Sequence, residues 1–127
     1  MNEIQLQLQR LAERVILRFR EVPEFSHEDA LLFVEDSKYV HGYTENQLIP
    51  AKDERLVALY AMKEVAMSVA FQSAHYFKFT DGEESIDKTR VAHNYRQLAK
   101  DYLNEYNREK AKSSGSMFRI VGRADRP

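Results

Sequence analysis

Apolar residues recur at helical spacing through the first part of the chain, which predicts an amphipathic helix. Pro23 interrupts the pattern, so we expect this helix to run from about residue 3 to residue 20. The positions that carry the pattern are Ile4, Leu8, Leu11, Val15 and Phe19.

A second and a third helix are expected from capping signals and from apolar content. Ser26 and Asp29 have the spacing of a capping box, which predicts a short acidic helix over residues 27 to 40. Pro50 suits the first position of a third helix. From Leu56 to Phe79 the sequence is apolar on nearly every face of a helix, which is typical of a helix buried on most sides.

A fourth helix is expected after the turn dipeptide Asp81-Gly82, where Ser85 or Asp87 can cap a helix that runs to about Lys112. Its apolar stripe repeats at helical spacing, which predicts one buried face. The stripe consists of Val91, Tyr95, Leu98, Tyr102 and Tyr106.

The chain ends in a different pattern. Residues 113 to 116 form a Ser/Gly hinge, and residues 117 to 121 have the composition of a short strand, although no strand pattern precedes them. The sequence therefore predicts an all-α fold, with a four-helix bundle-like body over residues 1–112, a central buried helix, and a flexible hinge and extended C-terminal arm over residues 113–127. The expected core includes Leu56, Leu59, Tyr60, Val65, Val69 and Leu98.

Composition adds limits on the class of protein. A chain of 127 residues with 43% hydrophobic and 31% charged residues is expected to form one soluble domain. It contains no Cys, which excludes disulfides, thiolate zinc sites and cysteine nucleophiles, and which fits a reducing cytosol. We expect no signal peptide. We also expect no membrane span, because charged residues interrupt the apolar third helix.

The net charge of −1 conceals a segregation of charge along the chain. Residues 1 to 20 carry four Arg against two Glu, and residues 21 to 41 carry six acids against Lys38. Residues 87 to 112 carry seven Lys or Arg against four acids. Acidic and basic zones of this kind can pair between copies of one chain, although solvated helix faces give the same pattern.

Candidate chemistry is sparse. The four His have no metal-ligand spacing, no motif places a nucleophile beside a base, and no phosphate-binding loop occurs. We therefore expect neither an enzyme nor a cofactor or metal. The acidic turn with Asp81, Glu83 and Glu84 lacks the alternating ligands of a calcium loop and is expected to be solvated.

The tyrosines of the fourth helix have two possible roles. Beside Arg96 and Arg108, the rings of Tyr95, Tyr102 and Tyr106 could stack on nucleic-acid bases. Aromatic residues at helical spacing are more often core, and a Tyr hydroxyl at the rim also suits a subunit interface. We favour core or subunit interface over base stacking.

The last helix and the segment before it resemble the small head–tail connector proteins of tailed bacteriophages, the adaptor or head-completion family below the portal. The resemblance covers roughly the second to the fourth helix. Its most specific part is residues 85 to 89, SIDKT, followed by Tyr95, Leu98, Ala99, Tyr102 and Tyr106.

The resemblance implies a structural virion protein at the head–tail interface. Such a protein forms a ring, usually dodecameric, that docks on the portal protein, extends the DNA channel and provides the platform for a stopper or tail-completion protein. DNA passes through without sequence-specific binding, and no membrane is involved. The acidic turn is then expected to face the channel. The arm is expected to bind the portal through Met117, Phe118, Arg119, Ile120, Val121 and Arg123.

Two other classes remain open. A small DNA-binding phage protein, such as a small terminase subunit or a helix-turn-helix protein, is also helical and carries basic residues. A bacterial helical interaction domain without a viral role is the third class. Duplex DNA binding would favour the first of these alternatives, and copurification with a portal protein would separate the connector from the second.

Overall fold

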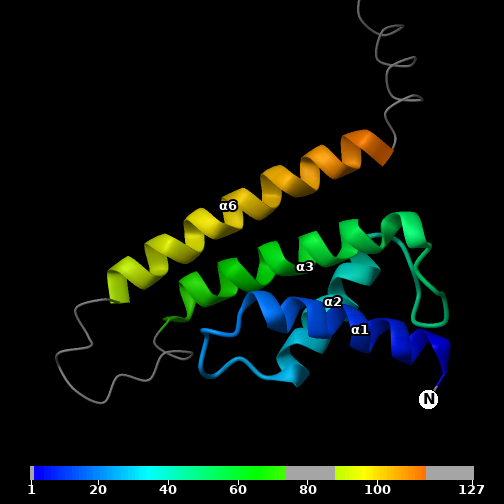
Figure 1. Ribbon diagram of the computed structural model, residues 1–127, viewed down its shortest axis with the longest axis horizontal. Coiled ribbons are helices and arrows are strands. Elements are labelled where there is room, and N and C mark those ends of the chain that lie inside the picture. The colour runs from blue at the N-terminus through cyan, green and yellow to red at the C-terminus, as the bar shows by residue number, and fades with distance from the viewer. Residues whose placement is uncertain (1, 74–87, 114–127) are drawn as a thin grey trace, which may run out of the picture.

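The computed structural model describes residues 2–73 and 88–113. These residues form four α-helices and no strand: α1 (Glu3–Arg18), α2 (His27–Val40), α3 (Ala51–Phe71) and α6 (Lys88–Ser113) (Figure 1). The predicted all-α, four-helix body is therefore confirmed. The predicted arm at residues 114–127 lies outside the described residues.

Side-chain caps determine where the first two helices begin. Asn2 accepts a hydrogen bond from the backbone N–H of Gln5, and the Gln5 side chain accepts one from the N–H of Asn2. Ser26 and Asp29 form the same reciprocal pair at the start of α2, as the sequence predicted. Each pair satisfies backbone donors that the first helical turn leaves free.

Helix α3 is the central element. It contacts α6, α2 and α1, and its buried residues are spread around the helix rather than confined to one stripe. This confirms the central buried helix. The helix ends at Phe71, where the N–H of Gln72 bonds to the carbonyl of Ser68; residues 74–79 of the longer predicted helix lie outside the described part.

In Figure 1, α3 lies between α6 and the pair formed by α1 and α2. Helices α3 and α6 are antiparallel, since Arg55 near the start of α3 pairs with Glu109 near the end of α6. Helix α6 therefore covers one side of α3, while α1 and α2 cover the other. Of the described helices, none is long and apolar enough to cross a membrane.

The main core joins α1, α2 and α3 with Ala99 of α6. Four of the predicted core residues, Leu56, Leu59, Val65 and Val69, are buried. The other two, Tyr60 and Leu98, are partly buried and pack against the core. The prediction of which helix residues face inward was therefore correct for the middle of α3.

Candidate functional site

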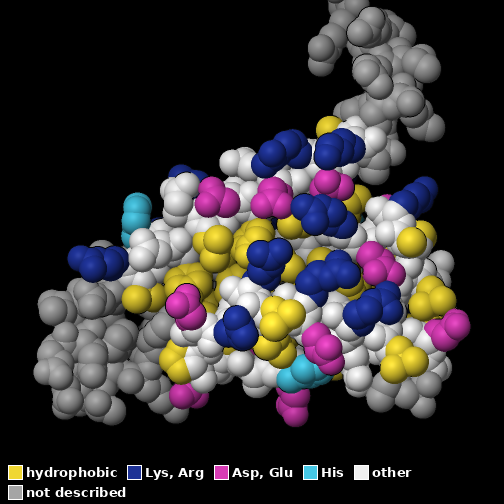
Figure 2. Space-filling model, viewed as in Figure 1, with side chains coloured by type: hydrophobic (Ala, Val, Ile, Leu, Met, Phe, Trp, Pro, Cys, Tyr) yellow, Lys and Arg dark blue, Asp and Glu magenta, His cyan; other side chains and the backbone are white. Residues whose placement is uncertain are grey.

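The solvent-facing side of α6 is rich in bases. Helical spacing places the apolar stripe of α6 against α3, so the opposite side faces solvent. Glu105 and Glu109 lie toward α3, where Arg55 pairs with them at 3.2 and 3.4 Å. In Figure 2, Lys and Arg side chains follow the outer edge of α6 and acids lie between α6 and α3. We define the basic face as the exposed residues Arg90, His93, Arg96, Lys100, Leu103 and Arg108.

The solvent-facing side of α2 is acidic with an apolar centre. Its inner side is buried by Ala30 and Val34, so residues at the opposite helical positions face outward. Leu32 is 64% exposed and Tyr39 is 52% exposed, both large apolar side chains on a surface. We define the acidic face as Glu28, Leu32, Glu35, Asp36 and Tyr39.

The two faces point away from each other. Helices α2 and α6 pack on different sides of α3, and each helix turns its apolar side toward the core, so their solvent-facing sides are directed away from each other. Within the described residues, no ion pair joins the acids of the acidic face to the bases of the basic face. The charges of the two faces are therefore not paired with each other within one subunit.

The three tyrosines predicted as core or interface lie on the inner side of α6. Tyr95 and Tyr102 have their ring centroids 6.4 and 6.1 Å from that of Phe19 at the end of α1. Tyr106 is buried. Burial raises the pKa of Tyr106, and nearby Tyr60 and Asp53 raise it further. The prediction that these tyrosines belong to the core is therefore confirmed, while their role in a subunit interface stays a prediction.

His41, at the end of α2, contacts Tyr106 of α6 and Tyr60 of α3. Its Nδ1 lies 2.7 Å from the carbonyl oxygen of Ser37, which can only accept, so Nδ1 carries the proton. In the neutral ring, Nε2 then accepts a hydrogen bond from the Tyr106 hydroxyl at 2.8 Å. The ring of Tyr60 packs edge-on against both. No sequence pattern indicates this cluster, because His41 and Tyr106 are 65 residues apart in the chain.

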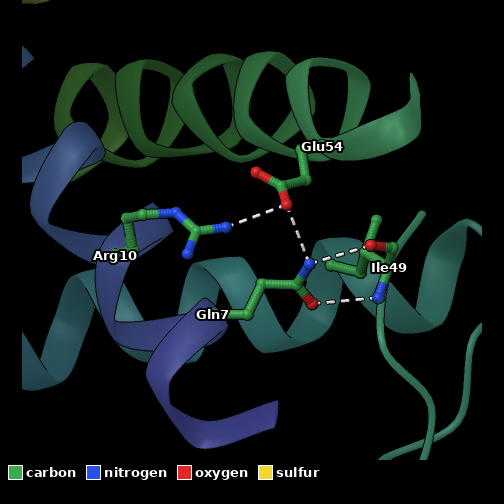
Figure 3. Close-up of polar contacts among 4 residues, drawn as sticks. All are labelled: Gln7, Arg10, Ile49 and Glu54. Atoms are coloured by element: carbon green, nitrogen blue, oxygen red, sulfur yellow. Dashed lines mark hydrogen bonds and ion pairs between the residues drawn. The ribbon is translucent and has the colours of Figure 1, made fainter. Parts of the chain in front are cut away.

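The side chain of Gln7 connects α1 to the loop between α2 and α3 through hydrogen bonds (Figure 3). Its side-chain Nε2 donates to the carbonyl of Ile49 at 2.8 Å, and its Oε1 accepts from the N–H of Ile49 at 2.9 Å. Nε2 also donates to Glu54, whose same oxygen accepts from Arg10, each at 2.9 Å. Burial acts to raise the pKa of Glu54, but these hydrogen bonds and the charge of Arg10 lower it overall. The amide of Gln7 thus holds one end of α3 in register with α1.

Lys38 lies in the wall of a cavity of about 260 Å³ between the start of α1, the end of α2 and the following loop. The side chain is only 1% exposed, and Nζ is a buried atom without a hydrogen-bond partner among the described residues. Burial lowers the pKa of Lys38, and the charges of Glu35 and Glu45 offset part of this effect. An unpartnered buried amine costs stability, most of all when charged.

Two sets of predicted residues lie outside the described part of the chain. The acidic turn, Asp81, Glu83 and Glu84, falls in the segment 74–87, and the portal-binding arm falls in 114–127. The channel-facing and portal-binding roles of these residues stay predictions.

Among residues 2–73 and 88–113, no group of three or more acidic or His side chains could hold a metal ion. Comparison with protein-family models, curated proteins and solved structures finds no match to this chain. Function must therefore be inferred from the geometry of the chain itself, above all from its two charged faces.

Proposed function

We propose that this protein is a structural head–tail connector of a tailed bacteriophage. Copies of the chain would form a ring below the portal, extend the DNA channel and provide the platform for a stopper or tail-completion protein. The resemblance of the segment from residue 85 to Tyr106 to that family supports the proposal. The observation that carries it is the position of the acidic and basic faces on opposite sides of one subunit.

Opposite, complementary faces favour head-to-tail assembly. A face that met its own copy would place like charges together, which costs free energy. Contact between the basic face of one copy and the acidic face of the next avoids this and leaves the growing assembly with one free face of each kind. Such heterologous contacts close into a ring when the rotation per subunit allows it.

The spacing of the side chains matches in an antiparallel arrangement of α6 on α2. Leu103, which is 40% exposed, would pack on Leu32. Lys100 and Glu35 each lie one helical turn from these leucines, in opposite chain directions. Arg96 would then lie over the ring of Tyr39, two turns from the leucine contact, where a cation–π contact is favourable. The leucines would exclude water from the contact, while the Lys100–Glu35 pair and the Arg96–Tyr39 contact would set its register.

Disulfide crosslinking tests this contact directly, because the natural chain has no Cys. In a Leu32→Cys/Leu103→Cys variant, the two thiols lie on opposite sides of one subunit and can only pair between copies. We expect mild oxidation to give a ladder of covalent oligomers on a non-reducing gel. The single variants should remain monomeric, since head-to-tail contact never brings two copies of one position together.

A Leu17→Cys/Leu103→Cys variant is the matched control, because Leu17 is an exposed leucine on α1 outside both faces. Equal ladders from the control and the test variant would contradict the contact. The connector proposal is tested separately by electron microscopy of the chain mixed with portal particles from the same genome. A chain that neither forms rings nor decorates the portal particles would contradict it.

The basic face also favours a second candidate, a small DNA-binding phage protein. Charge reversal separates the two candidates. Glu35→Lys should weaken self-association, because it places like charges across the contact, but should leave DNA binding unchanged or stronger. A gel shift of duplex DNA at physiological salt that Lys100→Glu abolishes, without any self-association of the wild-type chain, would favour the DNA-binding protein.

A further inference from the structure

A third charged feature lies apart from both faces. A small groove of about 80 Å³ opens between α1, α3 and α6, and its walls include Arg14, Arg18, Arg55, Tyr102 and Glu105. Arg14 and Arg18 are one turn apart on α1, and Arg55 comes from the first turns of α3. In Figure 2, Lys and Arg side chains gather over α1 and α3 on the face drawn.

Positive charge exceeds negative charge in this groove. Arg55 is the partner of both Glu105 and Glu109, and the nearby Arg10 is the partner of Glu54. Within the described residues, Arg14 and Arg18 form no ion pair. The charge of Arg14 acts on nearby Glu54, and Glu105 lines the groove, but the guanidinium groups of Arg14 and Arg18 are not within ion-pair distance of either carboxylate.

The donors in the groove suit a tetrahedral anion. Guanidinium groups donate paired, planar hydrogen bonds to phosphate oxygens, and oxygens that point in several directions can accept from more than one of them. Tyr102 lines the groove together with Arg18, and a tyrosine hydroxyl can donate to a phosphate oxygen. The groove has room for a group of a few heavy atoms, such as a phosphate.

We infer that the groove formed by Arg14, Arg18 and Arg55 binds a phosphate group. This goes beyond the proposed connector function, since none of these residues belongs to the acidic or basic face. The phosphate is either a free ion or part of the backbone of a nucleic acid, and in both cases the rest of the ligand lies outside the groove.

Thermal unfolding tests the free ion. Inorganic phosphate should raise the melting temperature of the full chain by about 2 °C or more over sodium chloride of equal ionic strength and pH. The double variant Arg14→Gln/Arg18→Gln should lose this rise. Both side chains are exposed, so the variant should fold, which circular dichroism checks. The matched control Arg96→Gln/Lys100→Gln removes two charges from the basic face and should keep the rise.

Fluorescence anisotropy with labelled single- and double-stranded oligonucleotides tests the backbone. If the groove variant weakens oligonucleotide binding about tenfold, and more than the control variant does, the ligand is a backbone phosphate. If only the response to inorganic phosphate is lost, the ligand is a free phosphate. The inference is overturned if neither inorganic phosphate nor the oligonucleotides distinguish the wild-type chain from the groove variant.

Discussion

Lys38 is a charged residue type placed where the helix pattern would put an apolar one. It lies on the inner side of α2 beside Val34, and its stem fills space next to the start of α1. The methylene groups of a lysine can be buried at little cost when the ammonium group reaches water. Here Nζ has almost no exposed surface, and no acceptor among the described residues compensates it.

We expect Lys38→Met to stabilise the protein at pH 7 by about 1 to 2 kcal/mol, because methionine keeps most of the stem and removes the buried amine. The gain should shrink as the pH rises. In the wild-type chain the folded pKa of Lys38 lies below the ordinary value of 10.5, so the unfolded state binds more protons between those two values. Wild-type stability therefore rises with pH in that window through this group, while the variant lacks the effect.

Urea unfolding of both chains at pH 7 and at about pH 10 measures this difference. The comparison of two chains is needed because Tyr95, Tyr102 and Tyr106 have raised pKa values and destabilise both chains equally at high pH. A gain from Lys38→Met that is the same at both pH values would contradict the assignment.

The loop between α2 and α3 depends on a helix that is far away in the sequence. Gln7 satisfies both backbone groups of Ile49, whose own side chain is buried. These hydrogen bonds place Pro50 and the first turn of α3 against α1, next to the apolar core that Ile49 shares with Leu8. The latch formed by Gln7, Ile49, Glu54 and Arg10 therefore determines where α3 begins relative to α1.

We expect Gln7→Ala to lower the free energy of unfolding by about 2 to 3 kcal/mol, because it leaves the buried N–H and carbonyl of Ile49 without partners. Gln9→Ala is the matched control, since it makes the same change on the same helix where no hydrogen bond is lost among the described residues. Chemical denaturation compares the two variants. A Gln7→Ala chain as stable as the control would show that water replaces the latch.

The arrangement of helices places an apolar core in the interior and charged residues on the outer sides of α2 and α6. Helix α3 contacts all three other helices and offers little free surface, while α2 and α6 each give an outer side to solvent. In the proposed ring, contacts between copies are therefore expected to use α2 and α6 rather than the central helix.

Deleting residues 117–127 should leave the helical body folded, because the buried core of the described residues lies between Leu8 and Tyr106. Portal binding should be lost. A strand added to a partner's sheet contributes backbone hydrogen bonds, and burial of Phe118 and Ile120 contributes about 1.5 to 3 kcal/mol each before ordering costs. Repetition around a ring multiplies this contribution.

Cosedimentation of the truncated chain with portal particles tests the arm, and its melting curve checks the fold. Undiminished binding would show that the anchor lies elsewhere. Loss of the helical signal on truncation would instead show that the arm belongs to the body.

Local sequence was sufficient for the elements. The spacing of Ser26 and Asp29 predicted the start of α2, because a capping box is made of neighbours in the chain. The apolar content of residues 56 to 79 predicted the central helix, because burial on all sides requires apolar residues on all sides; within the described residues this helix ends at Phe71. The solvent-facing side of α6 can also be located from the sequence, because it lies opposite the apolar stripe of that helix.

Contacts between distant residues were decided only by the tertiary structure. Gln7 bonds to Ile49, 42 residues away, and His41 bonds to Tyr106, 65 residues away. No feature of the sequence next to Gln7 or His41 distinguishes these two residues from an exposed Gln or His. The sequence by itself determined which side of each helix is apolar, since that depends on helical periodicity alone. Only the packing of α3 between α2 and α6 decided that the acidic and basic faces point in opposite directions, since orientation depends on contacts that no local pattern encodes.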